Sequence, residues 1–321
     1  MPDGAEAATL PVIDLAPLAE GGTPGEAAVA AAIHAACTGP GFFYVRNHGV
    51  PEPVIAAAVA EARRFFHLPT EVKRNTRANL LHRGWHAAGG ALMQGAKKPD
   101  LKEFYSMGLD LPADHPAVLA GEKLRGPNQW PAEQPALRPA MEAYFAAVGA
   151  CGARLLRAVA VSLGLERDFF APHYRLPLQR TQAIFYPPQP PEDEDQFGLA
   201  AHTDFGCITL LWQDGSGGLE VRERRSGAWI PAPPLPGTLV VNVGDLLGRW
   251  SNDRFASTPH RVRNLSGHER MSIATFYDPD FAAPVDPRAL GATEPHYAPT
   301  TAGAHILACF DRAFAYRKQQ A

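Results

Sequence analysis

The stretch AHTDFGCITL, residues 201–210, sets two side chains that can bind a metal one residue apart, at the start of an apolar run. Residues two apart on an extended segment face the same side, so His202 and Asp204 can both point at one ion. Cys207 has the opposite parity, which argues against a thiolate ligand. A His-x-Asp pair alone is usually a surface or capping feature, so a metal site needs a further ligand.

His260, in the stretch STPHRVRN, is the best candidate for that ligand. Several short β-patterned segments separate it from His202, which is enough chain to cross a sandwich and return. Two imidazoles and one carboxylate on one side of an ion leave other coordination positions open, as in non-haem Fe(II) oxygenases. The same ligand types can hold zinc and activate a water molecule for hydrolysis, so the metal stays open at this point.

A second pair of side chains follows in the stretch ERMSIATFYDPD, residues 269–280. Arg270 and Ser272 share one face of a strand candidate. A guanidinium group offers two parallel charged donors and a serine hydroxyl a third, which suits a carboxylate. If this strand neighbours the metal, the pair would hold the far end of a dicarboxylate whose other end chelates the metal. 2-Oxoglutarate has that shape, although an ordinary strand arginine paired with a surface acid is the simpler alternative.

The segments that must position these residues are short and rich in β-formers. From residue 181 onward, apolar runs alternate with turn residues, which is typical of a sandwich or barrel and not of alternating β-α-β units. These runs are TQAIFY, CITLLWQ, GLEVRE, GAWIPA, TLVVNV, TPHRVRN and MSIATFYD.

Helical patterns lie on both sides of this β-rich part. Apolar residues recur every three or four positions over residues 135–165, which predicts one long amphipathic helix, kinked if its glycines bend it. Residues 25–37 and 52–68 predict two more helices, and residues 10–18 and 39–51 predict strands. The last predicted helix ends near Phe314 and Tyr316, which either cap a pocket or dock the helix.

The composition is that of an ordinary globular protein. The 321 residues are 46% hydrophobic and 20% charged, with 30 basic and 33 acidic residues and a net charge of −3. No global field therefore recruits nucleic acid or an anionic membrane, and the expected partner is a small molecule. The four cysteines are widely spaced, the start is not a secretory signal, and no segment is expected to span a membrane. We expect a cytoplasmic monomer.

Taken together, these segments resemble the isopenicillin N synthase-like group of Fe(II)/2-oxoglutarate-dependent dioxygenases over almost the whole chain. The order of the motifs is far more specific than any one of them. The matching stretches are LPVIDLAPL, GPGFFYVRNHGVP, FYPP, AHTDFGCITLL, GLEVR, GAWIPAPPLPGTLVVNVGDLLGRWSNDRFASTPHRV and RMSIATFYDPD.

The resemblance implies a mainly β fold with flanking helices. Its core would be a double-stranded β-helix, or jelly roll, with an N-terminal helical region and a C-terminal helix. We expect residues 1–110 to form the N-terminal α/β region of the family. Residues 111–321 would form a helix plus the jelly-roll oxygenase core, packed with the first part as one structural unit.

Carried over residue by residue, the resemblance makes His202, Asp204 and His260 the iron ligands. It likewise makes Arg270 and Ser272 the residues that bind the C5 carboxylate of 2-oxoglutarate, with the Tyr186 hydroxyl as a further donor.

The implied activity needs Fe(II), O2 and 2-oxoglutarate as cosubstrate. It oxidises a small-molecule metabolite with release of succinate and CO2. Hydroxylation is the default outcome, and desaturation or cyclisation follows if the pocket holds the substrate differently. Many relatives have Asn or Arg shortly before the Tyr-Pro pair, where this chain has Gln182 and Ile184. Roles carried by those residues elsewhere are therefore not expected here.

Substrate contacts are expected from the N-terminal region. Phe276 follows Ser272 on the same strand face and would bound the substrate space. The family places substrate-facing residues near residues 79–110, which makes Phe104 and Tyr105 candidates, with Arg83 and Trp85 nearby. Plain hydrophobic packing is an equally good interpretation of each of these aromatics.

Three alternatives remain beside a 2-oxoglutarate-dependent oxygenase. One is an iron-dependent oxidase of the same fold that takes its electrons from the substrate or from ascorbate. Another is a zinc hydrolase with the same ligands, which would need no carboxylate-binding pair. The third is a β-sandwich binding module without a metal, in which His202 could be replaced without loss of function.

Overall fold

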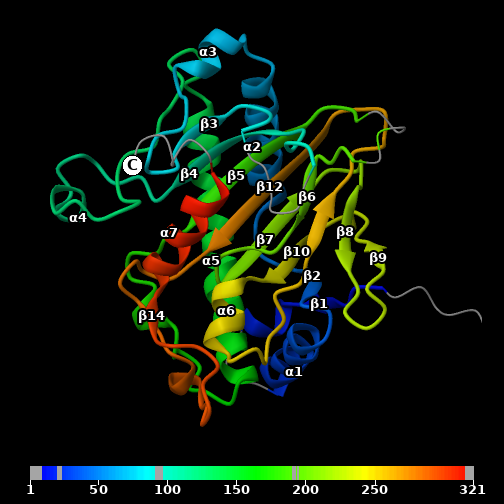
Figure 1. Cartoon of the computed structure of the whole chain (residues 1–321), viewed down its shortest axis with the longest axis vertical. Coiled ribbons are helices and arrows are strands. Elements are labelled where there is room, and N and C mark those ends of the chain that lie inside the picture. Colours follow the sequence, from blue (N-terminus) through cyan, green and yellow to red (C-terminus); the bar gives the residue numbers. More distant parts are fainter. Residues whose placement is uncertain (1–8, 20–23, 91–96, 190–192, 194, 315–321) are drawn as a thin grey trace, which may run out of the picture.

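The chain folds around two β-sheets, which Figure 1 shows in the centre and at the right of the molecule. The computed structural model describes residues 9–19, 24–90, 97–189, 193 and 195–314. The eight-stranded sheet has the order β1-β2-β10-β7-β12-β5-β4-β3. Its strands are β1 (Val12–Asp14), β2 (Phe42–Arg46), β3 (Gly84–His86), β4 (Glu103–Gly108), β5 (Arg180–Tyr186), β7 (Ile208–Gln213), β10 (Thr238–Val243) and β12 (Arg270–Tyr277).

A four-stranded sheet with the order β6-β11-β8-β9 supplies the second layer. Its strands are β6 (Leu199–His202), β8 (Leu219–Arg222), β9 (Trp229–Pro231) and β11 (His260–Val262). A separate pair consists of β13 (Pro284–Val285) and β14 (Thr300–Thr301). The antiparallel pairing across the two larger sheets confirms the double-stranded β-helix expected from the sequence.

Helices lie against the large sheet, whereas β8 and β9 of the small sheet form the right side of the molecule in Figure 1. The α-helices are α1 (Pro24–Thr38), α2 (Glu52–Phe66), α3 (Thr70–Arg74), α4 (Pro116–Leu119), α5 (Leu137–Ser162), α6 (Asp245–Trp250) and α7 (Ala302–Ala313). Short 3-10 helices are η1 (Ala16–Ala19), η2 (Ala171–His173) and η3 (Pro287–Leu290). The strand expected over residues 10–18 is limited to β1, because a 3-10 turn follows it at once. The C-terminal helix is confirmed as α7, which ends directly before Phe314, whereas Tyr316 lies outside the described residues.

Strand β12 shows how the sequence divides the two faces of the large sheet. Met271, Ile273 and Tyr277 belong to the core on the helix side, against α5. The alternate residues Arg270 and Ser272 line a cavity on the other face. A side-chain period of two therefore turns one continuous, nearly fully buried strand into an apolar face and a functional face.

Helix α5 runs without interruption along the outer face of the large sheet and also packs against α1 and α2. Its glycines serve close packing: a Cβ on Gly149 would lie 2.5 Å from the Gln179 amide oxygen, and one on Gly152 would lie 2.7 Å from the Tyr277 ring. By length and composition α5 could also cross a membrane, contrary to the expectation that no segment would. Half of its most apolar window is buried inside the protein, as in a core helix.

The strands before residue 110 add to both edges of the eight-stranded sheet, whose central strands come later in the sequence. Strand β2 pairs with β10, and β1 pairs in parallel with β2. At the other edge β4 pairs with β5, and β3 pairs with β4. The N-terminal part thus supplies both edges of the eight-stranded sheet.

Candidate functional site

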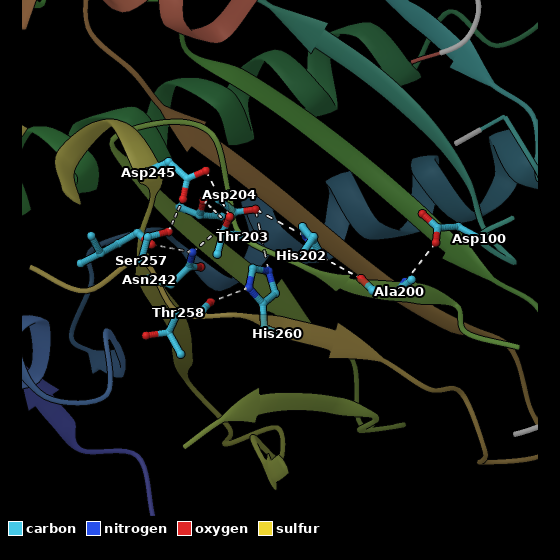
Figure 2. Close-up of polar contacts among 12 residues, drawn as sticks. Asp100, Ala200, His202, Thr203, Asp204, Asn242, Asp245, Ser257, Thr258 and His260 are labelled. Carbon is cyan, nitrogen blue, oxygen red and sulfur yellow. Dashed lines mark hydrogen bonds and ion pairs between the residues drawn. The ribbon is translucent and has the colours of Figure 1, made fainter. Parts of the chain in front are cut away.

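Three side chains that can bind a metal meet where the small sheet faces the large one (Figure 2). His202 ends β6 and His260 begins β11, and the two residues are direct partners in the antiparallel register. Asp204 lies in the loop after β6. One ligand atom from each residue falls within 4.8 Å of the other two. The Asp204 Oδ1 atom is 3.6 Å from His202 Nε2 and 3.8 Å from His260 Nε2.

Both imidazole rings are held by backbone carbonyl groups. His202 Nδ1 donates to the carbonyl oxygen of Ala200 at 2.9 Å, and His260 Nδ1 donates to that of Thr258 at 3.3 Å. A proton on each Nδ1 leaves the lone pair on each Nε2, on the side that faces Asp204. This arrangement fixes the tautomer and orientation of histidines that bind metals in proteins.

The two oxygens of the Asp204 carboxylate have different partners. Its Oδ2 accepts hydrogen bonds from the Thr209 hydroxyl at 2.6 Å and from the Asn242 amide at 2.7 Å. Oδ1 stays directed at the histidines (Figure 2). Burial raises the pKa of Asp204, but the attraction of the protonated forms of His260 and His202 and the hydrogen bond from Asn242 outweigh it and bring the pKa below its ordinary value. The carboxylate is therefore ionised.

His260 is buried at the inner side of the cluster. Burial, and then the positive charge of His202, lower the pKa of His260 to about 4, so the ring is neutral at pH 7. The Phe42 ring contacts His260 edge to face at 5.1 Å between centroids. A neutral, oriented imidazole is the form that binds a metal ion.

The loop that carries Asp204 is fastened from two sides. Asp245 accepts hydrogen bonds from Thr203 and from Ser257, and so links the end of β6 to the segment before His260 (Figure 2). Asp278 accepts one from the Cys207 backbone amide at 2.7 Å. Gly206 is needed here, because its Cβ would lie 1.9 Å from the Asp278 carboxylate. These contacts fix the ligand loop without filling the space in front of it.

Arg270 lies fully buried on the opposite sheet and lines the same cavity as the three ligands. Its Nε donates to the Gly217 carbonyl at 2.6 Å and its Nη2 to the Gln213 side chain at 3.1 Å. Its Nη1 lies 3.4 Å from the Ser272 hydroxyl. The structure thus brings Arg270 and Ser272 together on the cavity wall.

Tyr186 forms the floor beneath this arginine. It is the register partner of Arg270 across β5 and β12, and its ring centroid lies 4.7 Å from the Arg270 guanidinium carbon. The residue at position 198 must be glycine, because a Cβ there would come within 2.7 Å of the Tyr186 ring. Tyr186 also lines the cavity.

Of the remaining residues predicted from the sequence, one lines the cavity and the others lie outside its lining. Phe276 lines the cavity. Phe104 is buried just behind the wall, where its ring stacks on His86 with centroids 4.0 Å apart. Trp85 and Tyr105 face the opposite core, and Arg83 is buried away from the cavity against the Leu124 carbonyl.

Neither Trp85 nor Tyr105 points at the metal ligands. The Trp85 indole donates to Glu103, which also pairs with Lys73 at 2.8 Å. The Tyr105 hydroxyl donates to the Gln129 carbonyl at 2.5 Å. The structure therefore does not bring Trp85, Tyr105 or Arg83 into the cavity lining.

Several polar lining residues were not expected from the sequence. Lys102, Arg180 and Gln182 line the cavity, and so does His82, whose ring stacks on Phe310 of α7. Strand parity could have indicated Lys102, because residues 102 and 104 share one face and Tyr105 faces the other way. Nothing in the sequence indicates His82, which lies in a loop with a positive φ of 58°.

The geometry and the donor set fit a divalent transition metal. Two imidazoles and one ionised carboxylate converge from one side, and the cavity in front of them leaves room for further ligands. Arg270 and Ser272, whose groups can donate hydrogen bonds to an anion, lie on the facing sheet.

Two family descriptions match the chain. Residues 10–133 match the family described as non-haem dioxygenase in morphine synthesis N-terminal. Residues 176–279 match the 2OG-Fe(II) oxygenase superfamily. The second range contains the three metal-ligand candidates and the residues expected to bind 2-oxoglutarate, Arg270, Ser272 and Tyr186.

Similar proteins span nearly the whole chain. The 2-oxoglutarate-Fe(II) type oxidoreductase hxnY of Emericella nidulans is 35% identical, over 97% of this chain and 93% of that protein. Homoarginine-6-hydroxylase 2-ODD-C23 of Glycine max is 34% identical, over 87% of this chain and 88% of that protein.

Solved structures show the same arrangement of the backbone. A Neurospora crassa protein in complex with alpha-KG and thymine superposes with a TM-score of 0.84 at 29% identity, over 97% of this chain and 98% of that one. JOX2 in complex with 2OG, Fe and JA superposes with a TM-score of 0.79 at 31% identity, over 95% of this chain and 87% of that one.

Proposed function

Because the chain belongs to the 2OG-Fe(II) oxygenase superfamily and is a 2-oxoglutarate- and Fe(II)-dependent oxygenase, we propose that it hydroxylates a small-molecule metabolite with release of succinate and CO2. One observation carries this proposal. A buried arginine and serine face the His-Asp-His cluster across one cavity, so a diacid can reach both. Desaturation or cyclisation would need the same residues and a different placement of the substrate.

We assign the metal to Nε2 of His202, Oδ1 of Asp204 and Nε2 of His260. Fe(II) bound there supplies, together with 2-oxoglutarate and O2, the oxidising power for attack on a C–H bond. The protein contributes the orientation of the ligands. The carbonyl groups of Ala200 and Thr258 hold Nδ1 of each ring, so that Nε2 faces the ion.

We assign the C5 carboxylate of 2-oxoglutarate to Arg270, Ser272 and the Tyr186 hydroxyl. A buried charged donor group such as that of Arg270 binds a carboxylate more strongly than an exposed one does. Gln213 and Gly217 already occupy two of the guanidinium nitrogens, which holds the group in place before the diacid arrives. The role of this pair is therefore to bind and orient the cosubstrate.

Phe276 is proposed to bound the substrate space beside this carboxylate. Its aromatic neighbours along the cavity, among them Phe205 and Phe310, exclude water from the reacting region. Phe104 would support this wall from behind, whereas Trp85, Tyr105 and Arg83 would act through the packing of the N-terminal region.

The names of the similar proteins do not agree on a substrate. One is a homoarginine hydroxylase, and solved complexes contain thymine or JA. Specificity therefore rests on the lining residues of each chain and is not transferred from the fold.

Succinate release tests the proposed reaction. Purified protein supplied with Fe(II), 2-oxoglutarate, ascorbate and air is screened against a metabolite collection, and succinate is measured. A substrate should raise succinate release above the rate without substrate, in equal amount to the oxidised product. A substrate that is oxidised without succinate would support the oxidase alternative and contradict this proposal.

We further propose that the enzyme acts as a monomer in the cytoplasm. All four cysteines are buried and none forms a disulfide, which suits a reducing compartment. Size-exclusion chromatography with light scattering should give a mass near 34.6 kDa. A mass near twice that value at micromolar concentration would contradict the monomer.

A further inference from the structure

One cation of the cavity has no task in the proposed reaction. Lys102, directly before β4, lines the cavity and is 8% exposed. In the described residues no hydrogen-bond acceptor lies within range of its ammonium group. Lys102 forms an ion pair with the buried Asp100, but the distance to Oδ2 is 3.7 Å, and that oxygen accepts no hydrogen bond within the described residues. An ammonium group has three donors, and burying it without acceptors is costly.

The other charged groups of the cavity have direct partners or assigned tasks. Arg180 also lines it, and it donates to Asp278 at 2.9 Å in a buried ion pair, although its Nε has no hydrogen-bond partner in the described residues. Arg270 is assigned to 2-oxoglutarate, and Asp204 is assigned to the metal. Lys102 differs from Arg180 because its ion pair with Asp100 is longer than a hydrogen bond, which leaves its donors open to a ligand.

The position of Lys102 is fixed relative to the metal ligands. Asp100 Oδ1 accepts a hydrogen bond from the Ala200 amide at 3.0 Å, and Ala200 lies on β6, two residues before His202 (Figure 2). The Leu101 amide donates to the Phe197 carbonyl at 2.9 Å, just before the same strand. The lysine is thus tied to the metal strand and does not swing freely at the rim.

The walls beside the lysine are flat and apolar. Phe205, Phe276, Phe310 and Phe314 line the cavity. The Lys102 ammonium also lies 5.5 Å from the centre of the Phe104 ring behind the wall. Aromatic walls favour a planar or aromatic body, and one charged donor group favours an anionic end.

We propose that the substrate is a small carboxylic acid with a flat, apolar body, and that Lys102 binds its carboxylate. This inference rests on the proposed function, because it places the acid in front of the metal ligands.

Binding of matched acids and amides tests the proposal. Benzoate, phenylacetate and cinnamate are compared with benzamide, phenylacetamide and cinnamamide by calorimetry, on anaerobic protein saturated with Fe(II) and 2-oxoglutarate. We expect at least one acid to bind about tenfold or more tightly than its amide. Lys102→Met should reduce that ratio to about one, and Lys102→Arg should retain most of it.

The exposed Lys97, which pairs with Asp195, supplies the control. Lys97→Met should leave the ratio at the wild-type value. An absence of binding by all three acids, equal binding of acids and amides by the wild type, or an unchanged ratio in Lys102→Met would overturn the proposal. The visible absorption of the Fe(II)/2-oxoglutarate complex is recorded on the same samples. Its absence would overturn the proposed function, whereas its presence with a failed acid preference would overturn the lysine assignment alone. The presence of this absorption in a variant also shows that the variant is folded.

Discussion

At the scale of single residues, each proposed iron ligand has one polar atom engaged by the protein and another left for the ion. The histidines donate hydrogen bonds from Nδ1 to backbone carbonyl groups, and Asp204 accepts hydrogen bonds at Oδ2 from Thr209 and Asn242. Such contacts orient ligands and hold their protonation state before the metal binds.

Removing one of these contacts should weaken metal binding. Thr209→Val preserves shape but deletes the hydroxyl that donates to Asp204. We expect the Fe(II) dissociation constant to rise about tenfold, the lower end for supporting residues of metal ligands. Anaerobic Fe(II) titration measures it. Thr275→Val is the matched control, because it deletes a buried hydroxyl bonded to Thr181. Equal Fe(II) affinities in both variants would contradict the role of Thr209.

Arg270 allows the cosubstrate to be tested apart from the metal. Arg270→Ala should raise the 2-oxoglutarate concentration needed for half-saturation by about ten- to hundredfold, since a hydrogen bond to a charged group is worth about 1.5–3 kcal/mol. Fe(II) affinity should change little. Ser272→Ala should show a smaller rise. An unchanged 2-oxoglutarate requirement in Arg270→Ala would contradict the proposal that Arg270 binds the C5 carboxylate of 2-oxoglutarate.

At the scale of elements, strand alternation places the functional groups. On β12 the residues with even numbers line the cavity and those with odd numbers face α5. Close packing of α5 on this sheet keeps the register, and its glycines permit that approach.

Gly152→Ala tests this packing. Alanine favours a helix over glycine by about 1 kcal/mol, yet its methyl group would meet the Tyr277 ring at 2.7 Å. We expect overpacking to win and to lower the free energy of unfolding by about 1–3 kcal/mol in denaturant titration. Gly248→Ala in α6 is the control, since its Cβ would find only ordinary contacts, the nearest at 3.5 Å. A Gly152→Ala protein as stable as the wild type would refute this account.

The same alternation explains what the sequence could predict. Strand parity predicted that His202 shares a face with Asp204 and that Arg270 shares a face with Ser272. The family resemblance made His260 the third ligand and brought the two pairs together, and all five residues line one cavity. Phe104 and Tyr105 were both proposed as substrate contacts, although neighbours on a strand must face opposite sides. His82 reaches the cavity from a loop with a positive φ, which no local pattern encodes, whereas the parity of the strand could have indicated Lys102.

At the scale of the whole molecule, the N-terminal part completes the large sheet. We propose that residues 1–110 and 111–321 form one cooperative unit. Without the first part, β5 and β10 would lose their partners β4 and β2, and the helix α5 would lose α1 and α2. Exposed strand edges and apolar surface favour aggregation.

A fragment of residues 111–321 should therefore fail to fold alone. We expect no cooperative thermal unfolding transition by circular dichroism and no binding of Fe(II). Coexpression with residues 1–110 should restore some folded protein. A fragment that unfolds cooperatively and binds Fe(II) would show that the division marks two independent domains.

The central claim is that one cavity holds Fe(II) on three side chains and 2-oxoglutarate against Arg270. Anaerobic titration of the protein with Fe(II) and 2-oxoglutarate, followed by visible absorption, measures it most directly. The account predicts a charge-transfer band that saturates at one Fe(II) and one 2-oxoglutarate per chain, and that is absent in His260→Ala. A wild-type protein without the band, or a His260→Ala protein that retains it at the same concentrations, would contradict the account.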